Sequence, residues 1–434
     1  MKEIGIGLLG LGHVGSGVVR AIERNGALIA DRTGFRLIIR RIAVRDVGKV
    51  RPVKVDSALL TQDAASVIED PNVHVVVEMI GGTTDAHALT LQALQAGKPV
   101  VTANKALLAE RGDEIFAKAE RRHVDLYFGP SVGGGIPIIR GLREDLIGNH
   151  IVAMYGILNG TCNYILTRME QEHLPIETVL AEAQAAGYAE AEPSLDIDGW
   201  DTAHKAVILA STAYGFFVPM EDVDVRGIRD VALADIKEAR AMGFAMKLLA
   251  VIQHLDDGIS IRVQPTLVPD DNLLASVGGV FNAVLVVGDI VGEALFYGRG
   301  AGPDPTASAV LADLVDVGRN LIAGSENRVP ALARHHQYGG TRCPDDIPGR
   351  CYLRLLLRDE PGVLALVAEI CAAHKISIAS VRQYERGSDG HATVIIVTHS
   401  ALERQFNAAI AVIDGLDTIA APVVQYRIED FQHD

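Results

Sequence analysis

Gly10-Leu11-Gly12-His13-Val14-Gly15 is the most informative segment for the fold of the first part of this 434-residue chain. It matches the pattern G-x-G-x-x-G and directly follows Ile4–Gly10, an apolar run typical of a buried parallel strand. Apolar residues then recur near helical spacing from Val18 to Ile29. A helix that begins after such a turn can hold a pyrophosphate at its N-terminus, so residues 10–15 predict dinucleotide binding. A glycine turn without a ligand is the less favoured alternative.

The alternation of strand and helix patterns continues to about residue 130 and predicts a doubly wound parallel sheet of the Rossmann type. The expected strands are Phe35–Val44, Val73–Met79, Val100–Ala103 and Asp125–Phe128, and the expected helices are Ala86–Ala96 and Arg111–Arg121.

Beyond Val132 the regular alternation of strand and helix patterns ends. The patterns that follow predict an α+β second domain and then a small third domain. The second domain has helical patterns at Thr178–Ala186 and Trp200–Tyr214 and strand patterns at Ile259–Pro265 and Ala283–Val291. A run of proline, charge and histidine, Arg334–Arg350, predicts a flexible linker that isolates the tail. The tail has the ferredoxin-like order β-α-β-β-α-β, with elements at Tyr352–Leu357, Val363–Ala373, Ile376–Gln383, His391–Thr398, Ala401–Ile413 and Ala421–Ile428.

Composition excludes several classes of protein. The 49% hydrophobic and 22% charged content is ordinary for a globular chain, and the net charge of −15 disfavours a nucleic-acid partner. The four cysteines lie far apart without a C-x-x-C pair, which argues against a disulfide scaffold or a structural zinc site. The start lacks signal-peptide features and no segment is apolar enough to cross a membrane, so we expect a cytoplasmic protein with small-molecule partners.

Charges at the end of the second predicted strand bear on the choice of cofactor. An acidic side chain there would hold the ribose hydroxyls of NAD, whereas a basic one would hold the 2′-phosphate of NADP. The chain reads Val44-Arg45-Asp46, followed by Lys49 and Arg51. Arg45 and Lys49 favour NADP, and Asp46 leaves NAD open. Lys49 and Arg51 are about as well explained as surface loop charges.

Two further segments carry candidate chemistry. Thr102-Ala103-Asn104-Lys105 ends a buried strand, where the ligand crevice of such sheets lies, so Lys105 is either near the nicotinamide or an ordinary strand-end lysine.

From Gly187 to Lys205 five carboxylates precede or begin an apolar helix. Asp201 and Lys205 are four residues apart and share one helical face. An exposed ion pair is one interpretation, but the apolar helix favours a partly desolvated lysine with a tunable proton affinity.

Together these motifs resemble homoserine dehydrogenases, in particular the monofunctional bacterial form with a C-terminal ACT domain. The resemblance rests on residues 10–15, Thr102–Lys105, Asn159–Leu166, Gly187–Lys205, Gly300–Gly302 with Pro305–Ala307, and Asp359–Leu364.

The resemblance implies interconversion of L-homoserine and L-aspartate 4-semialdehyde with NADP or NAD, NADP being favoured, in threonine and methionine biosynthesis. It implies that Lys205 is the proton donor and acceptor, that Lys105 is its catalytic companion, and that Glu190, Asp201 and, more weakly, Asp196 bind substrate. The implied cofactor contacts are Gly10, Leu11, Gly12, His13, Val14, Gly15, Arg45, Thr102, Lys105 and Gly302.

The resemblance also implies a domain organisation. We expect a cofactor domain over residues 1–130, completed by 303–330, a substrate and dimerisation domain over 131–302, a linker over 331–349 and an ACT regulatory domain over 350–434. The ACT domain implies an amino-acid effector, with threonine expected, in a homodimer or homotetramer. A plain packing or dimerisation module is the alternative for the tail.

One position departs from the family pattern. Family members often bind a monovalent cation such as Na⁺ through a glutamate and through backbone carbonyls of a Val-x-Gly-Gly stretch. Val132, Gly134 and Ile136 match the carbonyl positions, but Gly129 stands in place of the glutamate, which leaves the metal site doubtful.

Two other functions compete with this reading of the chain. One is a sensor of nucleotides and amino acids whose dehydrogenase site is inactive, and the retained Lys105, Lys205, Glu190 and Asp201 argue against it. The other is a related amino-acid dehydrogenase or semialdehyde reductase. A phosphorylating semialdehyde dehydrogenase is disfavoured because no suitable cysteine nucleophile motif follows the glycine-rich unit.

Overall fold

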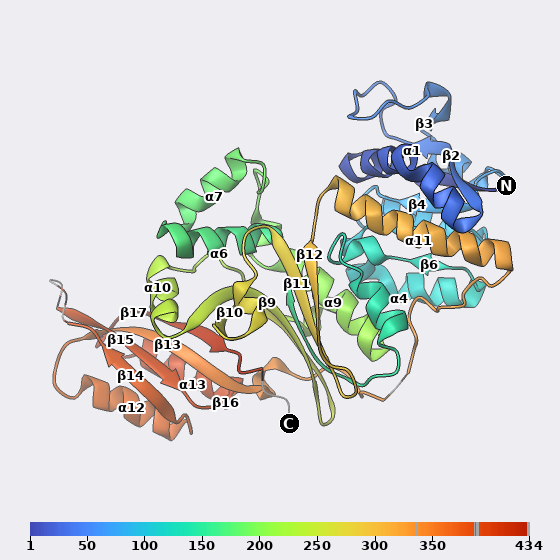
Figure 1. Ribbon diagram of the computed structural model, residues 1–434. Helices are drawn as coiled ribbons and strands as arrows, with labels where there is room; N and C mark the ends of the chain where they lie inside the picture. Colours follow the sequence, from blue (N-terminus) through green and yellow to red (C-terminus); the bar gives the residue numbers. More distant parts are fainter. Residues whose placement is uncertain (336, 386, 388–389, 432–434) are drawn as a thin grey trace. The chain divides into compact units, whose positions relative to one another are not determined.

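The computed structural model describes residues 1–335, 337–385, 387 and 390–431 (Figure 1). The chain forms two compact units. The first consists of Met1–Gly160, Asp201–Glu221 and Val280–Gly339, and the second of Thr161–Trp200, Asp222–Gly279 and the chain from Gly340 onward. Within the described residues, no helix has the length and apolar character needed to span a membrane.

A six-stranded parallel sheet organises the first unit. Its strand order is β3-β2-β1-β4-β5-β6, so the order reverses between β1 and β4. In such sheets ligands bind outside the carboxyl ends of the strands at this reversal, which is the crevice that the sequence predicted. The strands are β1 Lys2–Leu9, β2 Phe35–Ala43, β3 Leu60–Thr61, β4 Val75–Glu78, β5 Val100–Thr102 and β6 Leu126–Tyr127.

Helices connect these strands, and α1 and α11 lie side by side on the sheet (Figure 1). Apolar side chains of both helices, such as Val18 and Leu314, share a buried core with Ile6 and Val75. The helix expected from Arg111 begins six residues earlier, at Lys105, because the Asn104 side chain caps its N-terminus. The helices are α1 His13–Thr33, α2 Ala64–Glu69, α3 Asp85–Gln95, α4 Lys105–Arg122 and α11 Pro303–Ala323.

The rest of the first unit contains an antiparallel strand group and one long buried helix. The predicted helix Trp200–Tyr214 is confirmed with its bounds as α9. The predicted strand Ala283–Val291 ends earlier, at Gly288, because residues 289–291 turn back into a hairpin. The group consists of β7 Ile151–Ile157, β11 Phe281–Gly288 and β12 Gly292–Arg299, with the short helix α5 Ile138–Arg140 nearby in sequence.

The second unit contains a long hairpin and several helices. Strands β9 Phe244–Leu255 and β10 Gly258–Pro269 pair antiparallel over their full length, and the predicted strand Ile259–Pro265 is the centre of β10. The other elements are α6 Gly160–Glu172, α7 Ile176–Ala185, α8 Ser194–Ile197, β8 Asp224–Val225 and α10 Leu233–Ala241.

The tail has the predicted β-α-β-β-α-β order, with an additional two-residue strand. The helix expected from Ala401 begins at Glu403, because residues 401–402 pair as β16 with β13. Its sheet has the order β17-β13-β15-β14. The elements are β13 Pro348–Arg358, α12 Val363–Ala373, β14 Ile378–Gln383, β15 His391–Thr398, β16 Ala401–Leu402, α13 Glu403–Asp414 and β17 Ile419–Ile428.

The tail is not isolated, contrary to the expectation of a flexible linker. Strand β17 pairs in parallel with β10, with Thr266 opposite Arg427 and Leu267 opposite Ile428. The connecting segment is also held in place: the N–H of Ile259 donates to the carbonyl of Gly340, and the N–H of Arg342 donates to the carbonyl of Ile259, both at 2.8 Å. Pairing satisfies the backbone groups that an open edge of β10 would leave exposed.

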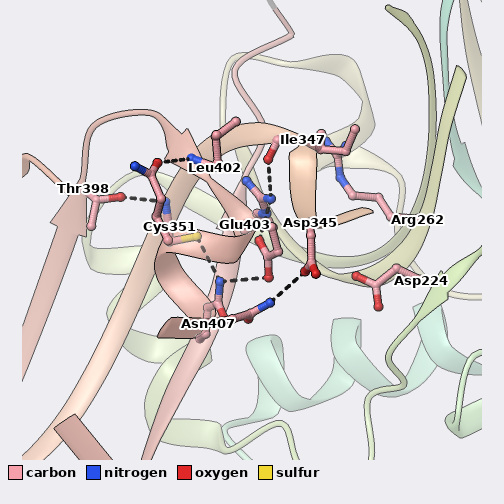
Figure 2. A network of polar contacts seen from close by, with 12 residues as sticks. Asp224, Arg262, Asp345, Ile347, Cys351, Thr398, Leu402, Glu403 and Asn407 are labelled. Carbon is pink, nitrogen blue, oxygen red and sulfur yellow. Dashed lines mark hydrogen bonds and ion pairs between the residues drawn. The ribbon is translucent and has the colours of Figure 1, made fainter. Parts of the chain in front are cut away.

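Buried ion pairs strengthen this contact. Arg427 lies 2.5 Å from Glu403, and Arg262 of β10 lies 2.6 Å from Glu429. Figure 2 shows the surrounding network of polar contacts near Ile347 and Glu403, in which the guanidinium of Arg427, from β17, donates to the carbonyl of Ile347 at 3.2 Å. The Asn407 amide also donates to Asp345 at 3.1 Å. The Arg262–Glu429 pair therefore joins the tail to the β9–β10 hairpin, while the Arg427–Glu403 pair holds β17 and α13 together inside the tail.

Glu403→Ala is predicted to destabilise the protein by about 3–5 kcal/mol, because it leaves the buried guanidinium of Arg427 without its carboxylate. The measurement is chemical denaturation. Glu360→Ala is the control, because Glu360 faces Arg358 at 3.9 Å in an exposed pair and should cost less than about 1 kcal/mol. Similar small losses in both variants would contradict the importance of the buried network.

Candidate active site

The glycine turn after β1 has the geometry that dinucleotide binding requires. Gly10 has a φ of +103°, a conformation that favours glycine. A Cβ at Gly15 would lie 2.5 Å from the carbonyl oxygen of Gly10, so only glycine lets α1 approach the turn this closely. At Gly12 a Cβ would meet nothing within 4 Å, which leaves open space above the N-terminus of α1. Gly302, with a φ of +119°, precedes α11, and a Cβ at Gly17 of α1 would lie 2.7 Å from the carbonyl oxygen of Pro303.

The basic side chains of the loop after β2 differ in their contacts. The Asp46 carboxylate accepts the N–H of Gly48 at 2.8 Å, and Arg51 donates to the carbonyls of Asp46 and Lys49. Arg45 is exposed, and within the described part of the chain its side chain pairs with no carboxylate. Arg45 and the exposed Lys49 are therefore the candidates in this loop for contact with an anion, and Arg45 lies nearer to the end of β2.

A single carboxylate, Asp201, joins the two candidate lysines. Its Oδ1 lies 2.9 Å from the Nζ of Lys105, and its Oδ2 lies 2.6 Å from the Nζ of Lys205. Lys205 and Asp201 are on α9, one turn apart, whereas Lys105 is the first residue of α4. The side chains of Asp201 and Lys205 are 5% and 9% exposed, so the exposed ion pair considered for them is ruled out. The Lys105 side chain is 34% exposed and is the accessible member of the group.

Backbone and amide groups complete this cluster. The Asn159 amide donates to Asp201 at 2.8 Å, and Lys205 also donates to the carbonyl of Leu158 at 2.6 Å. The Asn282 amide donates to the same carbonyl at 2.8 Å. An ammonium group has three N–H donors, and these contacts use two of those on Lys205. The sequence singled out Asn159 only as part of a family motif, and Asn282 carried no signal because its role depends on strand pairing.

The cluster contains more positive charge than negative charge. Burial would raise the pKa of Asp201, but the ammonium groups of Lys205 and Lys105 outweigh it and hold the pKa well below its usual range. Asp201 therefore stays ionised at any physiological pH. Burial also lowers the pKa of the neighbouring His204, which favours its neutral form. Two ammonium groups around one carboxylate leave a net positive charge, which suits an oxygen that gains negative charge during a reaction.

Lys105 is positioned by a network that the sequence did not reveal. Glu78, at the end of β4, accepts a hydrogen bond from the Thr102 hydroxyl at 2.6 Å. That hydroxyl accepts the N–H of Asn104 at 3.0 Å, and the Asn104 side chain caps α4 by accepting the N–H of Leu107 at 3.1 Å. A carboxylate at the carboxyl end of a central strand was the available signal, since the ligand crevice lies at that edge.

Two candidate substrate residues, Glu190 and Asp196, belong to the second unit. Glu190 is exposed, and its carbonyl accepts the Gln184 amide at 3.0 Å. Asp196 is partly buried in α8, where its carbonyl accepts the Cys162 thiol at 3.2 Å. The segment that carries them is held locally, because the Thr161 hydroxyl donates to the carbonyl of Tyr188 at 2.9 Å.

The loop that would bind a monovalent cation does not supply the expected donor set. Gly129 offers no side chain, and the carboxylate beside it comes from Asp313 of α11, which accepts the Gly129 N–H at 3.0 Å. Burial raises the pKa of Asp313 to about 7, and Arg143 opposes this rise. The Ile136 carbonyl accepts the N–H of Ile138 at 2.9 Å. Since the Asp313 carboxylate accepts a backbone N–H of the loop, and Gly129 offers no side chain, the loop lacks the glutamate ligand of the family's cation site, and the proton chemistry of the lysine cluster involves no metal.

Three segments of the chain match known protein families. Residues 10–129 match the family described as "Homoserine dehydrogenase, NAD binding domain", residues 137–315 match "Homoserine dehydrogenase", and residues 352–417 match "ACT domain".

Whole proteins are similar over almost their full length. Homoserine dehydrogenase of Pseudomonas aeruginosa is 45% identical over 99% of both chains, and that of Neisseria gonorrhoeae is 42% identical over 100% of both. The crystal structure of a homoserine dehydrogenase from Thiobacillus denitrificans is 43% identical, covers 99% of both chains and superimposes with a TM-score of 0.90. A hyperthermophilic archaeal homoserine dehydrogenase in complex with NADPH is 28% identical over 73% of this chain and 98% of its own, with a TM-score of 0.62.

Proposed function

This chain belongs to the homoserine dehydrogenase family, and we propose that it interconverts L-homoserine and L-aspartate 4-semialdehyde with Lys205 as the proton-transfer residue. The observation that carries this proposal is the buried Asp201 carboxylate between Lys105 and Lys205. An NAD(P)-dependent oxidoreductase of this kind needs a proton donor beside the substrate oxygen. The cluster supplies one that is held in a fixed position by Asp201 and by the carbonyl of Leu158.

The cofactor, when bound, supplies or accepts the hydride, and the residues of the chain manage the proton. In the reductive direction the Lys205 ammonium donates a proton through its third N–H to the aldehyde oxygen as that oxygen gains negative charge. In the oxidative direction the Lys205 amine accepts the hydroxyl proton. Asp201 stabilises the charged form of Lys205, and the Lys105 ammonium balances the Asp201 carboxylate after the proton has left, so that the site is then neutral.

The remaining roles follow from charge. Asp201 and Glu190 bind the substrate ammonium group, and Asp196 contributes more weakly. Residues 10–15, Thr102, Lys105 and Gly302 contact the cofactor, while Arg45 meets the 2′-phosphate of NADP. The open space at Gly12 and the exposure of Arg45 support this assignment.

The domain roles are also part of the proposal. Residues 1–130 with 303–330 bind the cofactor, 131–302 bind substrate and mediate assembly into a homodimer or homotetramer, and 350–434 form the regulatory ACT domain after the linker at 331–349. A cavity of about 350 Å³ in the tail, lined by the Asp359–Leu364 turn and Gln383, supports binding of an amino-acid effector, for which we propose threonine.

Lys205→Ala is predicted to lower kcat by about 10²–10⁴-fold, the usual range for loss of a general acid-base group, with cofactor affinity nearly unchanged. Steady-state kinetics with homoserine and NADP measure this. Lys247→Ala is a matched control, because Lys247 is also a buried lysine, bonded to the carbonyl of Val277 at 2.7 Å, but lies in β9. A change confined to the KM for homoserine would show that Lys205 only binds substrate.

Arg45→Ala is predicted to weaken NADP binding by roughly 1.5–3 kcal/mol, the contribution of a charge-assisted hydrogen bond, and to affect NAD much less. Calorimetry with both cofactors tests this. Lys54→Ala, a change of an exposed lysine farther along the chain, is the control and should change neither affinity strongly. Equal losses for NADP and NAD would overturn the assignment of Arg45 to the 2′-phosphate.

Threonine is predicted to inhibit the full-length enzyme, and Gln383→Leu is predicted to raise the threonine concentration needed for half-inhibition by roughly 5-fold or more, within the usual range of allosteric coupling. Gln383 lines the cavity, where its amide lies 3.3 Å from the Asp359 carboxylate. A point substitution is preferable to truncation because β17 pairs with β10. Glu369→Ala, an exposed change on α12, is the control. Full-length enzyme that ignores threonine would leave the tail as a packing module.

A further inference from the structure

We infer that Glu78 is a positioning residue of the active site, which sets both the glycine turn at residues 80–82 and the first turn of α4. The inference rests on the proposed role of Lys105, the residue with which α4 begins. Glu78 is the last residue of β4, opposite Leu9 of β1 and Thr102 of β5. It therefore lies at the carboxyl edge of the sheet, where the strand order reverses and the ligand crevice of such sheets is found.

The Glu78 carboxylate is completely buried and accepts hydrogen bonds on both oxygens. Its Oε1 accepts the N–H of Ile80 at 2.8 Å and that of Gly81 at 3.4 Å, while its Oε2 accepts the Thr102 hydroxyl at 2.6 Å. The first two contacts hold the turn after β4, in which Gly81 and Gly82 have positive φ angles. One side chain therefore fixes the ends of two neighbouring strands.

The contact to Thr102 continues to Lys105. The Thr102 hydroxyl uses its proton for Glu78, so its lone pairs are left to accept the N–H of Asn104 at 3.0 Å. Asn104 then caps α4 and donates to the carbonyl of Gly82 at 2.8 Å, which returns to the turn that Glu78 holds. Lys105, the next residue, reaches Asp201 at 2.9 Å. A displacement of Glu78 is thus transmitted to both the turn and the lysine.

Stability alone does not explain a carboxylate at this position. Burial raises the pKa of Glu78, which means that the fold disfavours its charge, and among the described residues no basic side chain forms an ion pair with it. Glutamine cannot replace it without loss: the carboxylate faces the Thr102 hydroxyl, the N–H groups of Ile80 and Gly81 and the Asn104 amide, whereas an amide offers one acceptor oxygen and one NH₂ group. The NH₂ group of a glutamine at position 78 would therefore point either at the N–H groups of the turn or at the Thr102 hydroxyl, so that two donors would face each other.

Asp125 provides a matched control. It is also a buried carboxylate of the same sheet, 1% exposed, and it accepts the Asn320 amide at 3.0 Å and the N–H of Asn327 at 2.8 Å. Burial raises its pKa as it does for Glu78. Asp125 directly precedes β6, at the amino edge of the sheet and away from the crevice, so it shares the burial of Glu78 without its connection to Lys105.

The experiment compares Glu78→Gln with Asp125→Asn in the full-length protein. For each variant, Tm, the Kd for NADPH in the absence of substrate, and kcat and KM for homoserine are measured well below Tm. We expect both variants to lose thermal stability. Only Glu78→Gln should raise the Kd for NADPH and lower kcat, by roughly 10- to 100-fold, the size of effect that a misplacement of about 1 Å produces. Thr102→Val, which keeps Glu78 but removes the link to Asn104, should lower kcat in the same direction.

The outcomes separate this inference from the proposed function. Matching kinetics and NADPH affinity in Glu78→Gln and Asp125→Asn would overturn the positioning role and leave a purely structural one. If Glu78→Gln does not fold, Thr102→Val decides the question, and wild-type kinetics in that variant would refute the relay. Wild-type enzyme without homoserine-dependent reduction of NADP would instead refute the proposed function, whereas the NADPH affinities would still test whether Glu78 holds the turn.

Discussion

The buried Asp201 carboxylate, shared by two ammonium groups, is the interaction on which the arrangement of the site depends. A charge removed from water needs an opposite charge or several hydrogen-bond donors, and Asp201 obtains two opposite charges only because a helix from the middle of the chain meets the first residue of α4. The same contacts keep Lys205 dry and Lys105 accessible. One electrostatic requirement therefore sets both the packing of α9 and the chemistry of the site.

The parallel sheet supplies the surface against which this cluster is built. The reversal of strand order places the ends of β1, β4 and β5 side by side, so the glycine turn, Glu78 and Thr102 reach one edge from sequence positions far apart. The polar network at that edge is satisfied by backbone and hydroxyl donors, which restricts movement of the loops that follow. Such restriction favours preorganisation, since the donors need not reorient during the reaction.

Backbone pairing between strands and buried ion pairing join the C-terminal domain to the rest of the second unit. Parallel pairing of β17 with β10 and the ion pair of Arg262 with Glu429 connect the tail to the β9–β10 hairpin. An effector that changes the tail would therefore act on a continuous sheet and not on a tethered module. An effector that binds one arrangement of this sheet more tightly than another shifts the equilibrium between the two arrangements.

The classes of element and the local chemistry of the glycine turn could be predicted from the sequence, because apolar periodicity and steric limits on glycine act over a few residues. The spacing of Asp201 and Lys205 likewise predicted that they share one helical face. The meeting of Lys105 with Asp201, the roles of Glu78 and Asn282, and the carboxylate that Asp313 brings to Gly129 were decided only by tertiary structure. So was the docking of the tail, for which the linker composition suggested the opposite. Such contacts join residues far apart in the chain, and their formation depends on burial and strand register, which no local pattern encodes.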